Sequence, residues 1–481
     1  MNYAVIKRML GWLLIFEAVF FLIPLITAIV YGEDAVFAFL ICIAICGAIG
    51  GLCLIGKPKD DSLYAKEGFV IVALSWIVIS LFGALPFVFT GAIPNYIDAL
   101  FETVSGFTTT GSSIIDSSVI ESLPKSILIW RSFTHWVGGM GVLVFIMALL
   151  PLSGGKNMHM MKAESPGPSV SKLVPKVRTT ALMLYLIYFV MSLVQFILLI
   201  CGGMPVFDAL TAVFATAGTG GFSIKQDSFL GYSSYSQIVV TVFMLLFSLN
   251  FNSYYLICKG KWKDAFTAEI KTFLIIVASA IAIVTASVYF SGTITSFGAA
   301  LKHAAFSVSS IISTTGFATE DFGVWPALSQ TVLVMIMFIG ACAGSTGGGI
   351  KVSRLLILFK GAKHQMGKLL HPNLVKKITM DKKVVDDDVV QGVYAFFSAY
   401  VFIFAISLLI VCLNGFDLTT NFTAVAATIN NIGPGLGIVG PAGNFAAFSP
   451  LSKIVFIFDM LVGRLEVFPM LVLFAPSTWK K

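Results

Sequence analysis

Long apolar runs alternate with short amphipathic ones along this chain. We expect membrane-length helices over ten of the long runs: 9–30, 35–56, 69–90, 126–150, 180–201, 234–258, 268–291, 327–361 (interrupted), 389–413 and 450–476. Four further runs are too short to cross a bilayer: 95–107, 206–217, 298–311 and 418–429. Backbone that enters a bilayer without crossing it must be buried in protein or line water, so these four predict re-entrant half-helices.

Each half-helix ends in a glycine-containing turn and is flanked by long apolar runs. The turns lie roughly a hundred residues apart, which predicts a fourfold duplicated membrane unit rather than a solenoid. The predicted fold class is an all-α polytopic membrane protein, with four pseudo-repeats of helix, re-entrant pore half-helix, filter turn and helix around a central ion pore. Two extra N-terminal membrane helices precede them. The predicted divisions are an accessory hairpin at 1–66 and repeats at 67–155, 156–260, 261–385 and 386–481.

The composition is that of an integral membrane protein and excludes a soluble enzyme. Of 481 residues, 57% are hydrophobic and 11% charged, and the mean hydropathy is +0.93, far outside the range of soluble domains. The seven cysteines fall almost entirely in apolar runs or at their ends, without paired spacing. Neither disulfides nor a zinc site is therefore predicted, and no cofactor is expected in this chain.

The net charge of +7 is explained by membrane orientation rather than by nucleic acid. If the N-terminus is cytoplasmic, the loops on that side hold 25 of the 31 Lys and Arg residues. Cytoplasmic loops are typically rich in these residues, so we expect both termini in the cytoplasm and all four half-helices entering from outside. The largest cytoplasmic connections, 151–178 and 361–388, either meet a soluble partner or are solvated loops.

The four turns have the composition of a cation filter. A dehydrated alkali cation needs a cage of oxygens, which backbone carbonyls supply when they point to one axis. Glycine permits the positive φ angles that such backbone demands, and threonine adds a hydroxyl acceptor. The alternative is that the turns only cap the half-helices. The predicted filter residues are Thr109, Thr110, Gly111, Thr219, Gly220, Gly221, Thr314, Thr315, Gly316, Asn431, Ile432 and Gly433.

A glycine-rich stretch interrupts the eighth long run. Its four glycines cannot remain helical, at about 1 kcal/mol each, and the freed backbone must face water or protein. The stretch is therefore predicted to be either a mobile gate below the filter or a structural hinge. It lacks the Gly-Lys-Ser/Thr ending of a nucleotide-binding loop. The residues concerned are Gly344, Ser345, Thr346, Gly347, Gly348 and Gly349.

Three charged residues stand out in or beside the apolar runs. Arg464 lies near the middle of the last run, where a guanidinium is costly unless it faces water or a carboxylate. It is predicted either to form a positive barrier in the pore or to pair with Asp459 or Glu466. Asp98 and Asp208 lie at the starts of two half-helices, where they are predicted to cap the helix and to interact with its dipole; drawing cations to the mouth is the alternative.

Over the whole chain, five motifs resemble those of the Trk/Ktr/HKT superfamily of potassium transporters. They are TVSGFTTTGSS, ATAGTGGFS, STTGFAT, NNIGPGLGIVGPAGNF and GRLEVFPMLVLFAPSTW. The resemblance implies potassium uptake across the bacterial inner membrane, a potassium ion bound in the pore, a homodimer, and gating by a cytosolic, TrkA-like nucleotide-binding regulatory subunit. It also implies that Gly344–Gly349 is an intramembrane loop and that Arg464 lies in the permeation path. The implied filter glycines are Gly111, Gly221 (or its neighbour Gly220), Gly316 and Gly433.

A proton- or sodium-coupled potassium symporter is the rival function. It requires a carboxylate or histidine relay at the bilayer midplane, for which the sequence offers only Glu17, Glu102 and Asp459. Glu17 is more simply explained by an interhelical hydrogen bond or by protonation. A subunit that conducts nothing would leave four registered turns unexplained, and no cluster of nucleophile and base indicates an enzyme.

Overall fold

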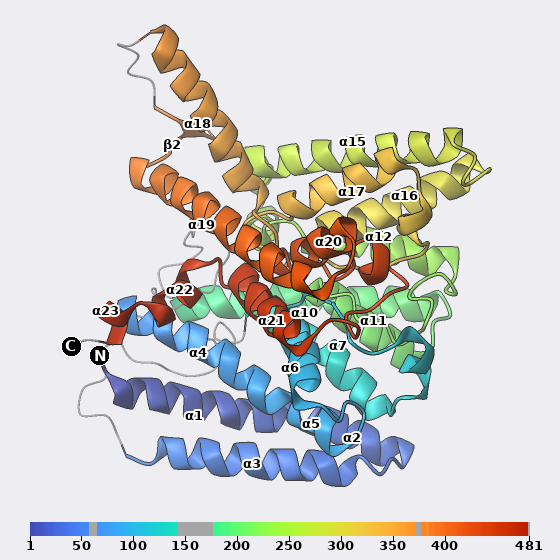
Figure 1. Cartoon of the computed structure of the whole chain (residues 1–481), viewed down its shortest axis with the longest axis vertical. Helices are drawn as coiled ribbons and strands as arrows, with labels where there is room; N and C mark the ends of the chain where they lie inside the picture. The colour runs from blue at the N-terminus through green and yellow to red at the C-terminus, as the bar shows by residue number, and fades with distance from the viewer. Residues whose placement is uncertain (57–64, 142–176, 372–376, 382, 480–481) are drawn as a thin grey trace.

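A computed structural model describes residues 1–56, 65–141, 177–371, 377–381 and 383–479. Its regular structure is helical apart from one hairpin, in which β1 (Thr379–Met380) pairs antiparallel with β2 (Lys383–Val384) (Figure 1). The helices are α1 (Tyr3–Phe20), α2 (Leu22–Tyr31), α3 (Val36–Leu54), α4 (Ala65–Gly83), α5 (Leu85–Phe89), α6 (Tyr96–Phe107), α7 (Lys125–Gly139), α10 (Val177–Cys201), α11 (Val206–Gly218), α12 (Ser234–Phe247), α13 (Phe251–Cys258), α14 (Trp262–Ala265), α15 (Ala268–Phe290), α16 (Phe297–Ile312), α17 (Ala327–Ile339), α18 (Val352–Leu370), α19 (Asp387–Val411), α20 (Leu418–Ile429), α21 (Pro450–Arg464), α22 (Phe468–Phe474) and α23 (Pro476–Trp479). Short 3-10 turns are η1 (Ser117–Ser122), η3 (Phe322–Val324), η4 (Cys412–Asn414) and η5 (Gly437–Val439).

Six of the ten predicted long helices and all four predicted short ones occur, within the described residues, where the apolar pattern placed them. Within the described residues, six helices are long and apolar enough to cross a membrane, or seven if the bent pair α12 and α13 is one span. The four predicted short helices are confirmed as α6, α11, α16 and α20, each with both ends within one residue of the expected bounds. The long and short helices are packed together as a bundle, and α18 projects from one end of it (Figure 1).

The helix that follows each of these short helices is itself short. α7, α12, α17 and α21 contain 15, 14, 13 and 15 residues, or about 20 Å at the α-helical rise, against the roughly 30 Å of a bilayer core. The prediction of unbroken helices over 234–258 and 450–476 is therefore wrong. The predicted helix 126–150 stops at Gly139, and its part from 142 onward lies outside the described residues, as does most of the 151–178 connection.

Local sequence and tertiary bonding explain these breaks. The chain turns by 92° between α12 and α13, where the Asn250 side chain caps α13 and the Ser248 carbonyl accepts a hydrogen bond from the Cys342 amide at 3.0 Å. After α21, Glu466 and Val467 both have positive φ. Apolar composition alone does not reveal a break whose freed backbone groups are bonded by another part of the chain.

The helices α1 and α3 of the N-terminal hairpin approach closely at Gly11 and Gly50, where a Cβ atom on either residue would lie 3.0 Å from the carbonyl oxygen of the other.

The N-terminal hairpin is bound to the rest of the bundle through a carboxylate. Glu33, in the connection between α2 and α3, accepts hydrogen bonds from the amides of Lys125 and Ser126 at 2.5 and 3.1 Å. Glu33 therefore caps α7, the helix that follows the first turn.

The apolar core is arranged around the half-helices. One cluster of buried side chains joins the N-terminal hairpin, α4 to α7 and α19 to α22, and two others lie among α10 to α13 and α15 to α17. In the first cluster the ring of Phe101 on α6 lies 5.5 Å from that of Phe445, which lies 5.4 Å from that of Phe456 on α21. α6 and α21, which are far apart in the sequence, are therefore packed together.

Candidate functional site

The four turns at the ends of α6, α11, α16 and α20 have the same backbone conformation. In each, a residue in the left-handed region is followed two positions later by a glycine with positive φ. The pairs are Thr109 and Gly111 (57° and 82°), Thr219 and Gly221 (57° and 77°), Thr314 and Gly316 (60° and 86°), and Asn431 and Gly433 (55° and 101°). Because this spacing is the same in all four turns, Gly221 rather than Gly220 corresponds in conformation to Gly111.

The left-handed residue costs energy at each turn. A non-glycine residue in such a sparsely populated region is strained by roughly 1–3 kcal/mol, and strain of this kind gathers at functional sites. The same closing hydrogen bond stabilises all four turns. The residue directly after the left-handed one donates its amide to the carbonyl of the residue five positions before itself. These bonds are Thr110 to Ser105 (2.8 Å), Gly220 to Ala215 (2.9 Å), Thr315 to Ser310 (2.8 Å) and Ile432 to Ala427 (2.9 Å).

The turns pack against one another in a closed ring. A Cβ atom added to the positive-φ glycine of one turn would lie too close to a carbonyl oxygen of the next turn. In every case this oxygen belongs to the residue that precedes the positive-φ glycine of that next turn. The pairs are Gly111 with Gly220, Gly221 with Thr315, Gly316 with Ile432, and Gly433 with Thr110, the last at 2.9 Å. The order is therefore first, second, third, fourth and first again, and glycine is required at each contact.

Two side chains close the ring between its first and last members. The Ser112 hydroxyl donates to the Gly433 carbonyl at 3.1 Å, and the Asn431 amide donates to the Thr110 hydroxyl at 2.9 Å. The Thr110 hydroxyl also bonds to that of Thr108 at the end of α6, at 2.8 Å. In this part of the ring the side chains are thus hydrogen-bonded to other groups of the first and fourth turns. The oxygens that all four turns have in common are their backbone carbonyls.

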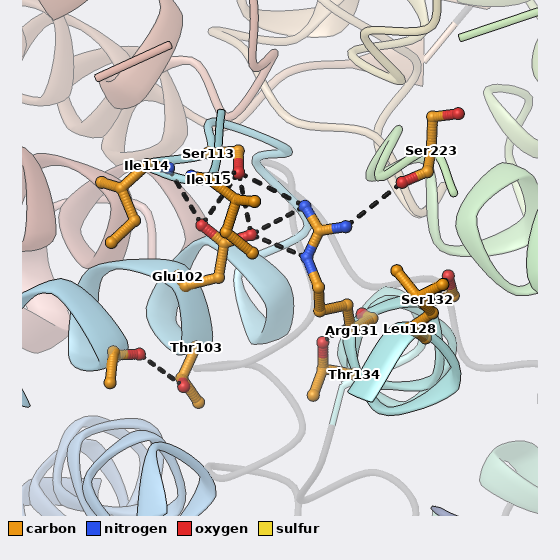
Figure 2. Close-up of polar contacts among 11 residues, drawn as sticks. Glu102, Thr103, Ser113, Ile114, Ile115, Leu128, Arg131, Ser132, Thr134 and Ser223 are labelled. Atoms are coloured by element: carbon orange, nitrogen blue, oxygen red, sulfur yellow. Dashed lines mark hydrogen bonds and ion pairs between the residues drawn. The ribbon is translucent and has the colours of Figure 1, made fainter. Parts of the chain in front are cut away.

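A buried ion pair anchors the first two turns to α7. Arg131 of α7 donates to Glu102 of α6, with nitrogen–oxygen distances of 2.8 and 2.7 Å (Figure 2). Glu102 also accepts from the Ser113 hydroxyl and the Ile114 amide, both at 3.0 Å, just after the first turn. Arg131 donates to the Ser223 carbonyl, just after the second turn, at 3.2 Å. Both charged side chains are almost fully buried, 2% and 0% exposed.

Sequence reasoning missed this pair. From the sequence, Glu102 is weighed only for a proton relay, and Arg131 is not singled out. The available signal is the presence of one residue of each sign within the apolar runs, because buried charges are normally paired. What the sequence could not give was the direction of the two side chains toward the same pair of turns.

The aspartates at the half-helix starts are not caps. Asn95 occupies the cap position of α6 and binds the first amides through its side chain, and Pro205 occupies that of α11. Asp98 instead forms an ion pair with Lys453 at 2.7 Å. The capping prediction is therefore wrong, although both Asp98 and Asp208 lie in the first helical turn, where a negative charge interacts favourably with the helix dipole.

The fourth half-helix does begin with a carboxylate cap, at a residue that sequence analysis did not single out. Asp417 accepts hydrogen bonds from the amide and hydroxyl of Thr420 at 3.0 and 2.5 Å. These bonds stabilise the charged carboxylate and lower the pKa of Asp417. Asp417 therefore adds a stabilised negative charge at the start of α20.

The glycine-rich stretch interrupts the helix between α17 and α18, as predicted, and lies against the ends of the third and fourth half-helices. The Gly348 amide donates to the Thr314 hydroxyl at 2.7 Å, and the Gly349 amide donates to the Asn430 carbonyl at 3.1 Å. A Cβ atom on Gly347 would lie 2.8 Å from the Ser313 carbonyl oxygen. The loop therefore contacts the turns through backbone atoms, and its glycines permit that approach.

Glu269, at the start of α15, joins the two ends of this loop. Its carboxylate accepts hydrogen bonds from the amides of Ala343 and Ser353, at 2.7 and 3.1 Å. Near the end of the loop, Lys351 has a positive φ and its ammonium group bonds to the Gly347 carbonyl. Nothing in the sequence near Glu269 indicated this role, since the two amides lie more than seventy residues further along the chain.

Arg464, at the end of α21, donates hydrogen bonds to three separate segments of the chain. Its guanidinium donates to the Thr346 carbonyl in the loop at 2.7 Å, and to the Gly138 and Gly139 carbonyls at the end of α7 at 2.5 and 2.7 Å. It also reaches the Thr109 hydroxyl in the first turn at 3.3 Å. Arg464 therefore connects the loop, α7 and the first turn.

The two acidic partners considered for Arg464 have bonds of their own. Asp459 accepts a hydrogen bond from Ser407 at 2.7 Å, and Glu466 forms an ion pair with Arg354. The sequence leaves open whether Arg464 faces the pore or an acidic partner. In the structure its guanidinium lies at the first turn and the glycine-rich loop.

Comparisons with known proteins match all or nearly all of the chain. A family model described as "TrkH: Cation transport protein" matches residues 35–481. Proteins named Trk system potassium uptake protein TrkH from Salmonella typhimurium and Escherichia coli K12 are each 37% identical over 492 residues, with 100% of both chains covered. The crystal structure of the potassium transporter TrkH from Vibrio parahaemolyticus superposes with a TM-score of 0.89 at 33% identity, again over 100% of both chains.

Proposed function

The chain belongs to the TrkH family of cation transport proteins, and we propose that its ring of four turns is the selectivity filter of a potassium pore. The protein is a multi-pass membrane transporter, not an enzyme, and it takes up potassium. The observation that carries the proposal is the closed contact order of the four turns, in which each glycine meets a carbonyl of its neighbour.

The ring supplies what a dehydrated potassium ion requires. Carbonyl oxygens from residues 109–111, 219–221, 314–316 and 431–433 replace the water of the ion. The four half-helices end at the turns, so the negative ends of their dipoles favour a cation beside the ring. Because neighbouring turns are in van der Waals contact, the ring resists shrinking around a smaller ion, and this resistance is the basis on which it favours potassium over sodium.

The glycine-rich loop and Arg464 act as the gate in this proposal. Residues Gly344–Gly349 lie between α17 and α18 and bond to the third and fourth turns, and Arg464 connects the same loop to α7 and the first turn. Conduction requires the loop to leave its position, which breaks the bond from Arg464 to the Thr346 carbonyl. The positive charge of Arg464 also opposes the passage of cations while the loop is in place.

Replacing Arg464 with glutamine tests the gate. Arg464→Gln is expected to raise rubidium flux into liposomes by about tenfold, because a hydrogen bond from a charged donor contributes roughly 1.5–3 kcal/mol to the closed state. The measurement is uptake of radioactive rubidium by purified protein without any partner. The matched control is Lys453→Gln, because Lys453 lies on the same helix as Arg464 and pairs with Asp98 of α6 instead of with the loop. Unchanged or lower flux in Arg464→Gln would contradict the gating role.

The proposed orientation places both termini in the cytoplasm of a bacterium whose inner membrane the protein spans. The start of α1 and the last described helix, α23, lie at the same edge of the molecule in Figure 1, and the Lys66 ammonium group bonds to the Ser477 carbonyl at 2.9 Å. The basic loops 151–178 and 361–388 then face a cytosolic regulatory partner of the Trk system. We propose a TrkA-like nucleotide-binding subunit for this partner, and a homodimer of the present chain.

Ion coupling is the alternative mechanism. Of the three carboxylates considered for a relay, Glu102 is paired with Arg131, and Asp459 accepts a bond from Ser407. Glu17 is fully buried, and neither of its carboxylate oxygens has a hydrogen-bond partner among the described residues, so the expected interhelical hydrogen bond is not present there. Glu102 and Asp459 thus have partners of their own rather than places in a shared relay, and protonation is the remaining explanation for Glu17.

A liposome experiment decides between the pore and the symporter. Purified protein is expected to pass rubidium in preference to sodium, down the rubidium gradient, with no accompanying change in internal pH. The measurement is rubidium uptake with a pH-sensitive dye inside the liposomes, at several fixed pH gradients. Rubidium entry that requires a proton or sodium gradient would favour the symporter.

A further inference from the structure

The second turn differs from the others at its middle position. Thr110, Thr315 and Ile432 occupy this position in the first, third and fourth turns, whereas the second turn has Gly220. Gly220 does not have a positive φ, so the backbone conformation does not require glycine there. Another cause must exclude a side chain.

The imidazole of His135 occupies the missing side-chain position. A Cβ atom on Gly220 would overlap the ring, and the three nearest atoms to it all belong to that ring. His135 lies on α7 and is fully buried. Its ring stacks on Phe222, just after the second turn, with centroids 4.3 Å apart and planes 26° apart. The Arg131 guanidinium also lies over the Phe222 ring, 4.1 Å from its centroid.

Neither nitrogen of the His135 ring has a hydrogen-bond partner among the residues that the structure describes. A buried polar group without a partner costs roughly 1–3 kcal/mol, so such a group calls for an explanation other than stability. The explanation offered by the geometry is the shape and place of the ring. It fills the space between α7 and the second turn that a side chain on Gly220 would otherwise fill.

We infer that His135 is a positioning residue that sets the second segment of the proposed filter. The inference rests on the proposed function of the ring. The imidazole supports the Gly220 backbone from behind, and the Gly220 carbonyl is the atom that meets Gly111 of the first turn. Without the imidazole, this carbonyl can move away from its neighbour, which widens one side of the ring and lets sodium be coordinated less unfavourably.

A double-mutant cycle tests the inference with the ratio of rubidium to sodium flux in liposomes. Gly220→Ala alone is expected to lower the ratio by about tenfold, because its methyl group overlaps the imidazole and the backbone must shift. His135→Ala alone is expected to lower it by a similar factor. In the His135→Ala background, adding Gly220→Ala is expected to cause no further loss or to restore part of the ratio, since the clash is gone.

The matched control is Gly51→Ala, at a helical glycine of α3 with no atom within 4 Å of an added Cβ, which should leave the ratio unchanged. His135→Asn serves as the second background if His135→Ala does not give monodisperse protein. An equal loss from Gly220→Ala with and without His135 would overturn the inference, as would a native ratio in His135→Ala. Wild-type protein that passes no rubidium, or passes it without preference, would instead overturn the proposed function.

Discussion

Gly316→Ser is expected to abolish selective rubidium uptake. Gly316 has a φ of 86°, where an L-residue costs roughly 1–2 kcal/mol. The added Cβ atom would also overlap the Ile432 carbonyl oxygen of the next turn and lie 2.9 Å from the Pro434 side chain. Neither obstacle is the end of a flexible side chain, so the backbone of the third or fourth turn must move. We expect the ratio of rubidium to sodium flux to fall by tenfold or more, as measured in liposomes.

A substitution at a second glycine, Gly292, distinguishes the effect of backbone strain from the effect of steric overlap with the next turn. Gly292, after α15, has a φ of 76°, and no atom lies within 4 Å of a Cβ added to it. Gly292→Ser therefore has the same conformational cost without the contact to a neighbouring turn, and it should keep the native flux ratio. Native selectivity in Gly316→Ser would show that the third turn is not part of the filter.

Glu102→Gln is expected to lower the free energy of unfolding by about 3–5 kcal/mol, because it leaves the buried Arg131 charge without a counter-charge. The neutral side chain also weakens the bonds to Ser113 and Ile114 that position the residues directly after the first turn. The measurement is denaturant or thermal unfolding in detergent, followed by tryptophan fluorescence. We expect Glu102→Gln combined with Arg131→Met to recover most of this loss, since the double variant removes both charges.

The ion pair between Asp98 and Lys453 provides the comparison. It has the same length, 2.7 Å, but its carboxylate is 25% exposed, and pairs in contact with solvent contribute roughly 0–1 kcal/mol. Asp98→Asn should therefore have a much smaller effect. Equal losses in Glu102→Gln and Asp98→Asn would mean that burial of the Glu102 pair is not what stabilises the first two turns.

The half-helices and turns could be predicted because their signals are local. An amphipathic run of about a dozen residues ending in a glycine turn specifies both the length of the helix and its end, and α20 begins and ends at the expected residues. The interruption before Lys351 was equally readable, since glycines at four of six positions cannot remain helical. Even the uncertain register at Gly220 and Gly221 came from a real difference between the turns.

The remaining features depend on contacts between distant parts of the chain. The breaks after α12 and α21 occur in predominantly apolar runs. At the first of them the Ser248 carbonyl accepts its hydrogen bond from Cys342, a residue far away in sequence. The roles of Arg131, His135 and Glu269 likewise require knowledge of which helix faces which turn. A single sequence shows that a charge lies in an apolar run, but not which group it meets.

The most direct test of the filter is to locate rubidium in crystals of the protein grown in rubidium chloride. An anomalous difference map should contain a peak inside the ring formed by residues 109–111, 219–221, 314–316 and 431–433, within coordination distance of their carbonyl oxygens. The Gly316→Ser variant should lack that peak. Rubidium bound elsewhere along the pore, with none inside the ring, would contradict the account.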